Sequence, residues 1–229
     1  MKSFYLIAGL LLAFHFQGIA QETPTESKPI IENRLTKPYP DGVYKSVFDF
    51  TRKVPTNQYA IVAKSMVGLN YEDLKGTPEQ CFFFYKFGEN PKINDAFAVC
   101  YQGTVYFRIK AILDNKSKHG RSEAAQFPNS FVRVDIQTPK YLYTDVDFAN
   151  AWTVGATSQI RGANMYASKK NTAVIWDSDE KVFHILKFCE DFNAFVAPLK
   201  PEFVQQCDKN QRADPDVVKA ALQSLIVKE

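Results

Sequence analysis

The spacing of apolar residues changes near residue 187, and this change constrains the fold more than any other feature of the chain. Between residues 60 and 186, short apolar runs are separated by polar turns, as in a succession of strands. Beyond them the apolar residues recur at helical spacing, and Asp214 followed by Pro215 marks the start of the last helix. Strands followed by helices predict an α+β domain with an antiparallel sheet covered on one side by C-terminal helices.

We expect about six to eight strands and two hairpins. The candidate strands are residues 60–64, 81–86, 96–101, 104–109, 131–137, 141–146, 173–176 and 182–186. Gln102-Gly103 and residues 177–180 predict the two hairpin turns. Residues 131–137 alternate cleanly between apolar and polar side chains, which predicts one strand, and residues 141–146 should continue the same sheet.

Four helices are predicted outside this strand region. One of them is indicated by the helical spacing of Phe188, Phe192, Phe195 and Val196. Ser46 can cap a short one with Val47, Phe48 and Phe50 facing inward, and Pro201 opens another that runs through Cys207. The last helix carries one apolar stripe that should pack on the sheet, formed by Val218, Ala221, Leu222 and Leu225.

The first twenty residues have the pattern of a cleaved export signal. Lys2 precedes an apolar run over residues 4–16, and Gly18-Ile19-Ala20 places small residues at the positions that a signal peptidase reads. This run of about 13 residues would span only about 20 Å as a helix, against a hydrocarbon core of roughly 30 Å. We expect cleavage between Ala20 and Gln21, and an exported protein of the periplasm or the medium.

Residues 21–40 are polar and rich in proline, which predicts a flexible tether before a single domain over residues 41–229. No later stretch approaches 18 consecutive apolar residues, so no transmembrane helix is expected after the signal. The net charge of +3 includes Lys2, which leaves with the signal. The remaining chain is close to neutral and carries no general footprint for nucleic acid.

The four cysteines allow two interpretations. In an exported protein they can oxidise, and the pairing that costs least joins Cys81 to Cys100 and Cys189 to Cys207, because each pair lies in neighbouring predicted elements. Alternatively, all four are buried as small apolar side chains. The sequence leaves both interpretations open.

The strong catalytic signatures are missing from the sequence, which contains no phosphate-binding glycine loop, no H-E-x-x-H and no G-x-S-x-G. Outside the signal only His119 and His184 can act as a general base, with cysteine or aspartate partners. His184 alternates with apolar residues and reads better as a histidine packed on the sheet. Asp177, Asp179 and Glu180 read as a hairpin turn rather than a calcium loop. We expect no cofactor and no metal.

Two surfaces are candidate binding sites. A basic loop gathers Lys116, Lys118, His119 and Arg121 near aromatic residues, and could bind an anionic glycan or a lipid head group. Trp152 lies in a stretch rich in small residues, and would form an apolar contact patch for a partner, such as an envelope protein, or for an envelope surface if it is exposed.

Several stretches resemble an uncharacterised exported family of Bacteroidota. The resemblance rests on Asp41-Gly42-Val43-Tyr44, Phe48-Asp49-Phe50, Pro55, residues 97–103 and 127–134, Asn150-Ala151-Trp152, and the aromatic helix after Val174-Ile175-Trp176-Asp177. It implies a bacterial envelope or secreted protein and brings no activity and no site residues.

These observations favour a non-enzymatic binding module that uses aromatic surface, since 14% of the residues are aromatic and catalytic side chains are scarce. The first alternative is a hydrolase with an unrecognised site around His119 or His184. The second is a purely structural envelope protein.

Overall fold

The computed structural model describes residues 39–66, 68, 70, 77–118, 123–148 and 171–226. The predicted signal with its cleavage site at Ala20 and Gln21, most of the tether, and the candidate residues His119, Arg121 and Trp152 lie outside these residues. The described residues belong to one unit. Among them, no helix is long and apolar enough to cross a membrane.

Two antiparallel sheets form the framework, which confirms the α+β class. The first sheet contains, in spatial order, β1 (Gly42–Tyr44), β4 (Ala98–Tyr101), β5 (Thr104–Arg108), β6 (Phe131–Arg133), β3 (Gln80–Tyr85) and β2 (Ile61–Lys64). The second contains β10 (Val182–Leu186), β9 (Thr172–Asp177), β8 (Tyr141–Val146) and β7 (Ile136–Gln137).

An aromatic core lies between the two sheets. Phe107 of β5, Trp176 of β9 and Phe183 of β10 are fully or almost fully buried there, and their rings contact one another edge to face or at a tilt. The short helices α1 (Val47–Thr51) and α2 (Ile109–Asp114) add buried residues to the same core. The opposite face of the six-stranded sheet is buried as well, and a second aromatic cluster with Phe83 at its centre covers it.

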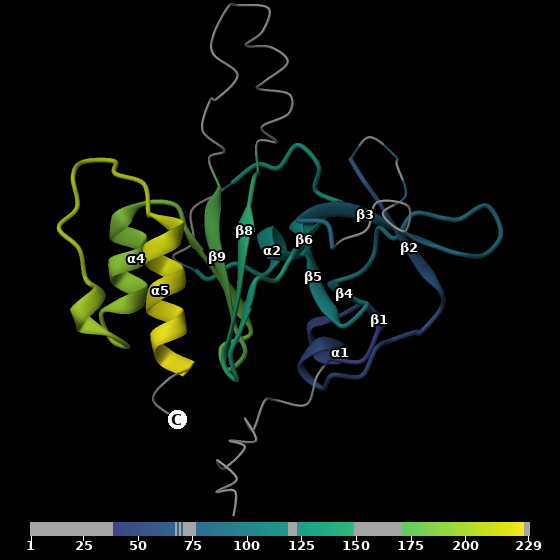
Figure 1. Cartoon of the computed structure of the whole chain (residues 1–229), viewed down its shortest axis with the longest axis horizontal. Helices are drawn as coiled ribbons and strands as arrows, with labels where there is room; N and C mark the ends of the chain where they lie inside the picture. The colour runs from purple at the N-terminus through teal and green to yellow at the C-terminus, as the bar shows by residue number, and fades with distance from the viewer. Residues whose placement is uncertain are drawn as a thin grey trace, which may run out of the picture. The chain divides into compact units, whose positions relative to one another are not determined.

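Helices cover the outer face of the four-stranded sheet, as the sequence predicts. Helices α4 (Cys189–Val196) and α5 (Pro215–Ile226) pack in one cluster with alternate residues of β8, β9 and β10, and the short turn η2 (Pro201–Phe203) lies between them in the chain. Figure 1 shows both helices on one side of β8 and β9, with the six-stranded sheet on the other. The Asp214 cap is confirmed, since Oδ1 of Asp214 accepts a hydrogen bond from the backbone N–H of Asp216 at 2.9 Å.

Both predicted hairpins are confirmed. At the first, Tyr101 pairs with Thr104, and the two turn residues have positive φ, 52° at Gln102 and 74° at Gly103. This conformation matches the right-handed twist of the flanking strands. At the second, Asp177 pairs with Val182 across the turn between β9 and β10.

The expected strand over residues 131–137 is wrong, because the chain changes sheets in its middle. Strand β6 ends at Arg133 and β7 begins at Ile136. The backbone N–H of Val134 still donates to Val105 in the first sheet, whereas that of Asp135 donates to Tyr143 in the second. Alternation persists through the crossing, so periodicity alone could not reveal that one expected sheet is in fact two.

Three smaller expectations also fail. Phe48 is 63% exposed, because the capping box of Ser46 and Asp49 orients α1 so that Phe50 points into the core instead. The helix opened by Pro201 ends at Phe203 rather than at Cys207. Residues 109–114, expected as the end of a strand and the start of the basic loop, form α2.

One of the two cysteine pairs is oxidised, and the other consists of buried free thiols. Cys189 and Cys207 form a disulfide, with Cα atoms 5.7 Å apart. The expected bond between Cys81 and Cys100 is wrong, because both are free and buried. Strands β5 and β6 separate β3 from β4, so the two cysteines lie about 14 Å apart at the usual strand spacing, well beyond disulfide reach.

Candidate functional site

Two neighbouring hairpin turns of the four-stranded sheet build the site. The turn between β7 and β8 is closed by Thr138, whose hydroxyl accepts the backbone N–H of Tyr141 at 2.7 Å. The turn between β9 and β10 is hydrogen-bonded to the first turn, since the backbone N–H of Ser178 donates to the carbonyl oxygen of Lys140 at 2.9 Å. This contact places the side chains of Lys140 and Tyr141 beside the residues of the second turn.

Asp177, the last residue of β9, organises the second turn. Its Oδ1 accepts backbone hydrogen bonds from Asp179 at 2.8 Å and Glu180 at 3.0 Å, which is the usual way an aspartate closes a turn. The side chain is only 5% exposed, and its Oδ2 lies 3.9 Å from the ammonium group of Lys140. The carboxylate is therefore fixed from one side and open toward Lys140 on the other.

His184 lies on the same face of the hairpin as Asp177. The register pairs Asp177 with Val182, and His184 follows two residues later, so both side chains point toward the helices. The imidazole packs at a tilt on Phe195 of α4, with ring centroids 5.2 Å apart. Burial lowers the pKa of His184, and the nearby carboxylates of Glu180 and Asp177 only partly oppose this effect, so the ring is neutral at pH 7.

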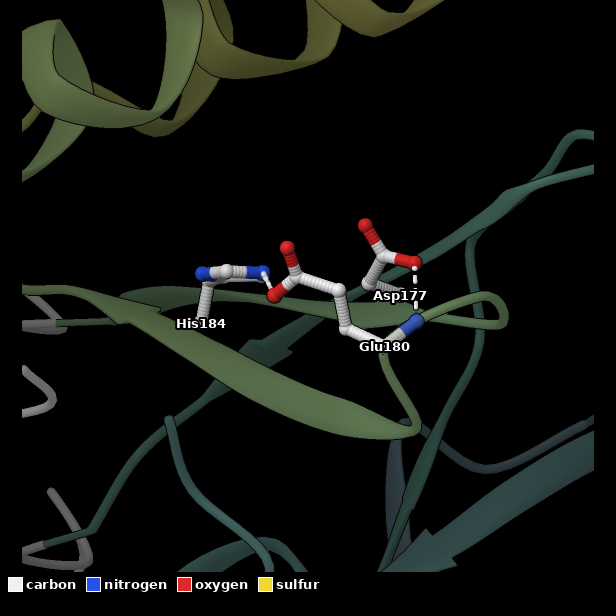
Figure 2. A group of neighbouring side chains, drawn as sticks. All are labelled: Asp177, Glu180 and His184. Carbon is white, nitrogen blue, oxygen red and sulfur yellow. Dashed lines mark hydrogen bonds and ion pairs between the residues drawn. The ribbon is translucent and has the colours of Figure 1, made fainter. Parts of the chain in front are cut away.

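Glu180 completes a group of three potential ligands. Its Oε2 is 3.7 Å from Nε2 of His184, and one ligand atom each from Asp177, Glu180 and His184 lies within 4.8 Å of the others. Figure 2 shows the three side chains standing on the side of the hairpin that faces the helices. Glu180 is the most exposed member of the group, with 64% of its side chain accessible.

A cavity of about 700 Å³ opens between this hairpin and α4. Its polar lining comes from Ser117, Lys118, Lys140, Asp177, Glu180, His184 and Asp191. Its apolar wall includes Tyr141, Val182, Phe195, Pro198 and Leu199, and the rings of Tyr141 and Phe195 meet edge to face at 5.5 Å. Burial raises the pKa of Tyr141, so its hydroxyl stays protonated and can donate. The pocket therefore has an apolar side and a charged side.

The sequence-predicted basic loop meets this pocket at one end. Lys118 lines it, and Lys116 lies beside β10, where it bridges to Phe183. His119, Arg121 and Trp152 lie outside the described residues.

The sequence did not group Asp177, Glu180 and His184, and it missed Lys140 and Tyr141. The hairpin prediction already held the needed signal for the first three. With Asp177 at one end of the turn and Val182 at the other, strand alternation places His184 on the same face.

The cysteines offer no nucleophile to this histidine. Burial, reinforced by Asp41, raises the pKa of Cys100 to about 12, and burial also raises the pKa of Cys81. Cys189 has no free thiol, because it forms a disulfide with Cys207. The hydrolase hypothesis therefore loses its cysteine partners, while an aspartate lies close to His184.

Comparison of the chain with models of known protein families, with curated proteins and with solved structures gives no match. The case for function consequently rests on the geometry of the site.

Proposed function

We propose that the protein is an exported, non-enzymatic binding module whose small-molecule ligand occupies the pocket between the β9–β10 hairpin and α4. The pocket itself carries this proposal. Its volume of about 700 Å³ falls within the roughly 300–1,000 Å³ of small-molecule sites, and it combines apolar walls with a few convergent polar groups.

The distribution of side chains suggests how a ligand would lie. The rings of Tyr141 and Phe195 offer an apolar surface to a flat or aliphatic portion. Lys140, Asp177 and His184 gather at the turn end and would receive a polar head group. We therefore expect an amphiphilic ligand rather than a purely apolar one.

The disulfide between Cys189 and Cys207 supports the export part of the proposal, because such bonds persist mainly in oxidising compartments. Intact mass spectrometry of the protein recovered from the envelope and the medium tests it. We expect a chain that begins at Gln21, with two thiols that alkylate only after denaturation. A full-length chain with four reactive thiols would contradict export.

Blocking the pocket tests the binding role. Ala194 of α4 is exposed and lines the pocket, so Ala194→Trp would fill it without disturbing the core. Ala197→Trp, one turn further along the chain, is the matched control because Ala197 is exposed and does not line the pocket.

The measurement is saturation-transfer NMR with a fragment library of aromatic and aliphatic acids and amines. We expect fragments that bind the wild type and Ala197→Trp but lose at least ten-fold in affinity for Ala194→Trp. Fragments that bind all three proteins equally, or no binding fragments at all, would overturn the proposal.

Hydrolysis at the same pocket is the second candidate function. The observation that favours it is the approach of Glu180 to the neutral imidazole of His184, because a carboxylate that orients a histidine is a common arrangement for a general base. Screening ester, amide and phosphoester substrates against wild type and His184→Phe tests it. Turnover that survives in the variant would exclude His184 as the base.

A further inference from the structure

We propose that Asp177, Glu180 and His184 bind one divalent transition-metal ion, with zinc as the best fit, at the polar end of the pocket. The inference deepens the binding role proposed above and rests on it, because the ion would anchor the ligand's head group. It departs from the sequence analysis, in which no metal was expected.

The donor set selects the class of metal. One imidazole nitrogen and two carboxylate oxygens suit zinc and its neighbours, whereas calcium prefers six to eight oxygen ligands. The two carboxylates carry two negative charges, which a divalent ion neutralises in this partly enclosed site. Within the described residues, these three are the group of side chains whose ligand atoms gather closely enough to hold an ion.

Asp177 is the ligand whose position the turn fixes most firmly. Its side chain is 95% buried, yet one carboxylate oxygen lacks a hydrogen bond among the described residues and meets only the Lys140 ammonium, at 3.9 Å. Oδ1, in contrast, is held by two backbone N–H groups. Metal-binding carboxylates are typically oriented in this way, with one side hydrogen-bonded and the other free to coordinate.

His184 is also held in place for coordination. Its ring packs on Phe195 of α4, with the two ring centroids 5.2 Å apart, and this contact fixes its orientation. Neither ring nitrogen makes a hydrogen bond within the described residues, and the approach of Glu180 at 3.7 Å is its polar contact there.

A small movement closes the site. The three ligand atoms lie within 4.8 Å of one another, whereas ligands around tetrahedral zinc are about 3.4 Å apart. Glu180 Oε2 is already 3.7 Å from Nε2 of His184, and its exposed side chain can rotate to follow the ion. Any remaining contraction between Asp177 and His184 requires small rotations of those two side chains. Lys140 keeps its 2.9 Å ion pair with Asp179 and would release Asp177.

Three protein ligands leave a coordination position open, as in zinc sites that bind a small molecule. Since all three ligands line the pocket, a molecule in the cavity can reach this position. A carboxylate or another oxyanion on the ligand would fill it, and the Lys140 ammonium nearby would favour the same charge. The inference therefore names the ligand class: an amphiphilic molecule with an anionic head group.

Isothermal titration with zinc chloride tests the site, on protein purified without a polyhistidine tag and treated with a chelator. We expect one zinc ion per chain. His184→Phe keeps the aromatic packing on Phe195 and should weaken zinc binding at least ten-fold, and Glu180→Gln should weaken it as well without touching the core.

Glu190→Gln is the matched control, because it removes an exposed carboxylate at the start of α4 that neither lines the pocket nor belongs to the three ligands. Its zinc affinity should stay within about two-fold of the wild type. If the wild type binds no zinc, or if folded His184→Phe and Glu180→Gln bind it as tightly as the wild type, the metal site is overturned. Equal losses in Glu190→Gln would reduce the effect to a general attraction of cations to carboxylates and overturn the site too.

The two proposals fail separately. Fragments that bind the wild type but not Ala194→Trp, in a protein without zinc affinity, would overturn the metal while leaving the binding module. Zinc affinity that depends on His184, in a protein that binds none of the fragments, would retain the metal and overturn the proposed ligand pocket.

Discussion

The six-stranded sheet and the helical layer each contain two cysteines and use them in opposite ways. In the sheet, Cys81 and Cys100 are free thiols packed within aromatic clusters. In the helical layer, Cys189 and Cys207 are joined, and the segment between α4 and α5 that carries Cys207 is largely exposed. Where aromatic burial on two faces holds the chain, no crosslink is needed. Where the covering layer is thin, a disulfide supplies the constraint.

This difference also explains where the pocket lies. Helix α5 covers β7, β8 and β9, whereas the eight-residue α4 packs on β10 and ends beside the hairpin turns. The part of the sheet face left open is the part that carries Asp177 and His184. The candidate site thus lies on the part of the four-stranded sheet that α4 and α5 leave uncovered.

The largest effect should come from the aromatic cluster around Phe83 on one face of the six-stranded sheet. Phe83 is fully buried and contacts three other aromatic rings edge to face. Phe83→Ala should lower the free energy of unfolding by about 3–5 kcal/mol, measured by urea denaturation. Phe48→Ala, at an exposed position, should change it by less than about 0.5 kcal/mol. Similar losses for the two variants would refute the claim that burial holds this region.

Removing the crosslink should have the next largest effect. The disulfide closes a loop with a sequence separation of 18 residues, for which the lost chain entropy corresponds to about 3 kcal/mol. Cys189→Ala with Cys207→Ala should therefore unfold at lower urea, and a reducing agent should bring the wild type to the same midpoint. If the reducing agent leaves the wild-type midpoint unchanged, the helical layer does not depend on its crosslink.

The ion pair that pins α5 to the sheet should rank third. Asp145 of β8 accepts the hydroxyl of the buried Tyr143 and lies 2.6 Å from the ammonium group of Lys219 on α5. Asp145→Asn should cost about 2 kcal/mol, because a partly buried cation loses its partner.

Asp95→Asn is the control for this pair, since Asp95 binds Lys45 at a well exposed site on the six-stranded side. Its cost should stay below about 1 kcal/mol. An equal cost for both variants would mean that α5 gains nothing from the burial of its ion pair. Thermal unfolding followed by circular dichroism distinguishes the outcomes.

The smallest effect concerns the cap of α1. Ser46 accepts the backbone N–H of Asp49 at 3.1 Å, so Ser46→Ala should cost about 1 kcal/mol in urea unfolding. Thr51→Ala removes a hydroxyl that bonds only to a carbonyl of its own helix, and should be nearly neutral. A loss above about 2 kcal/mol for Ser46→Ala would show that a local cap, as well as burial, supports the six-stranded region.

Much of the fold was predictable because its signals are local. The turn at Gln102-Gly103, the strand β8 and the cap at Asp214 each depend on residues that lie within a few positions of one another. The order of the strands was not predictable. Nothing in the neighbourhood of Cys81 or Cys100 indicates that two further strands come between them, since that order depends on long-range pairing.

The site shows the same division. The sequence identified the turn at residues 177–180 and the strand containing His184, yet it assessed the acidic residues and the histidine separately. Their convergence follows from hairpin register, which one local turn sets. The contribution of Phe195 and Lys140 could not be foreseen, because it depends on how α4 and a second turn pack against that hairpin.

The placement of Cys81 and Cys100 on opposite faces of one sheet bears on how the protein matures. Four thiols can in principle scramble into wrong partners, and secreted proteins often rely on an isomerase to correct such errors. Here, once the strands have paired, the two sheet thiols are shielded by aromatic rings on different sides, and each can reach neither the other nor the helical layer. The only bond left to form is the native one. If the sheet forms before the thiols oxidise, the fold itself prevents the non-native disulfides.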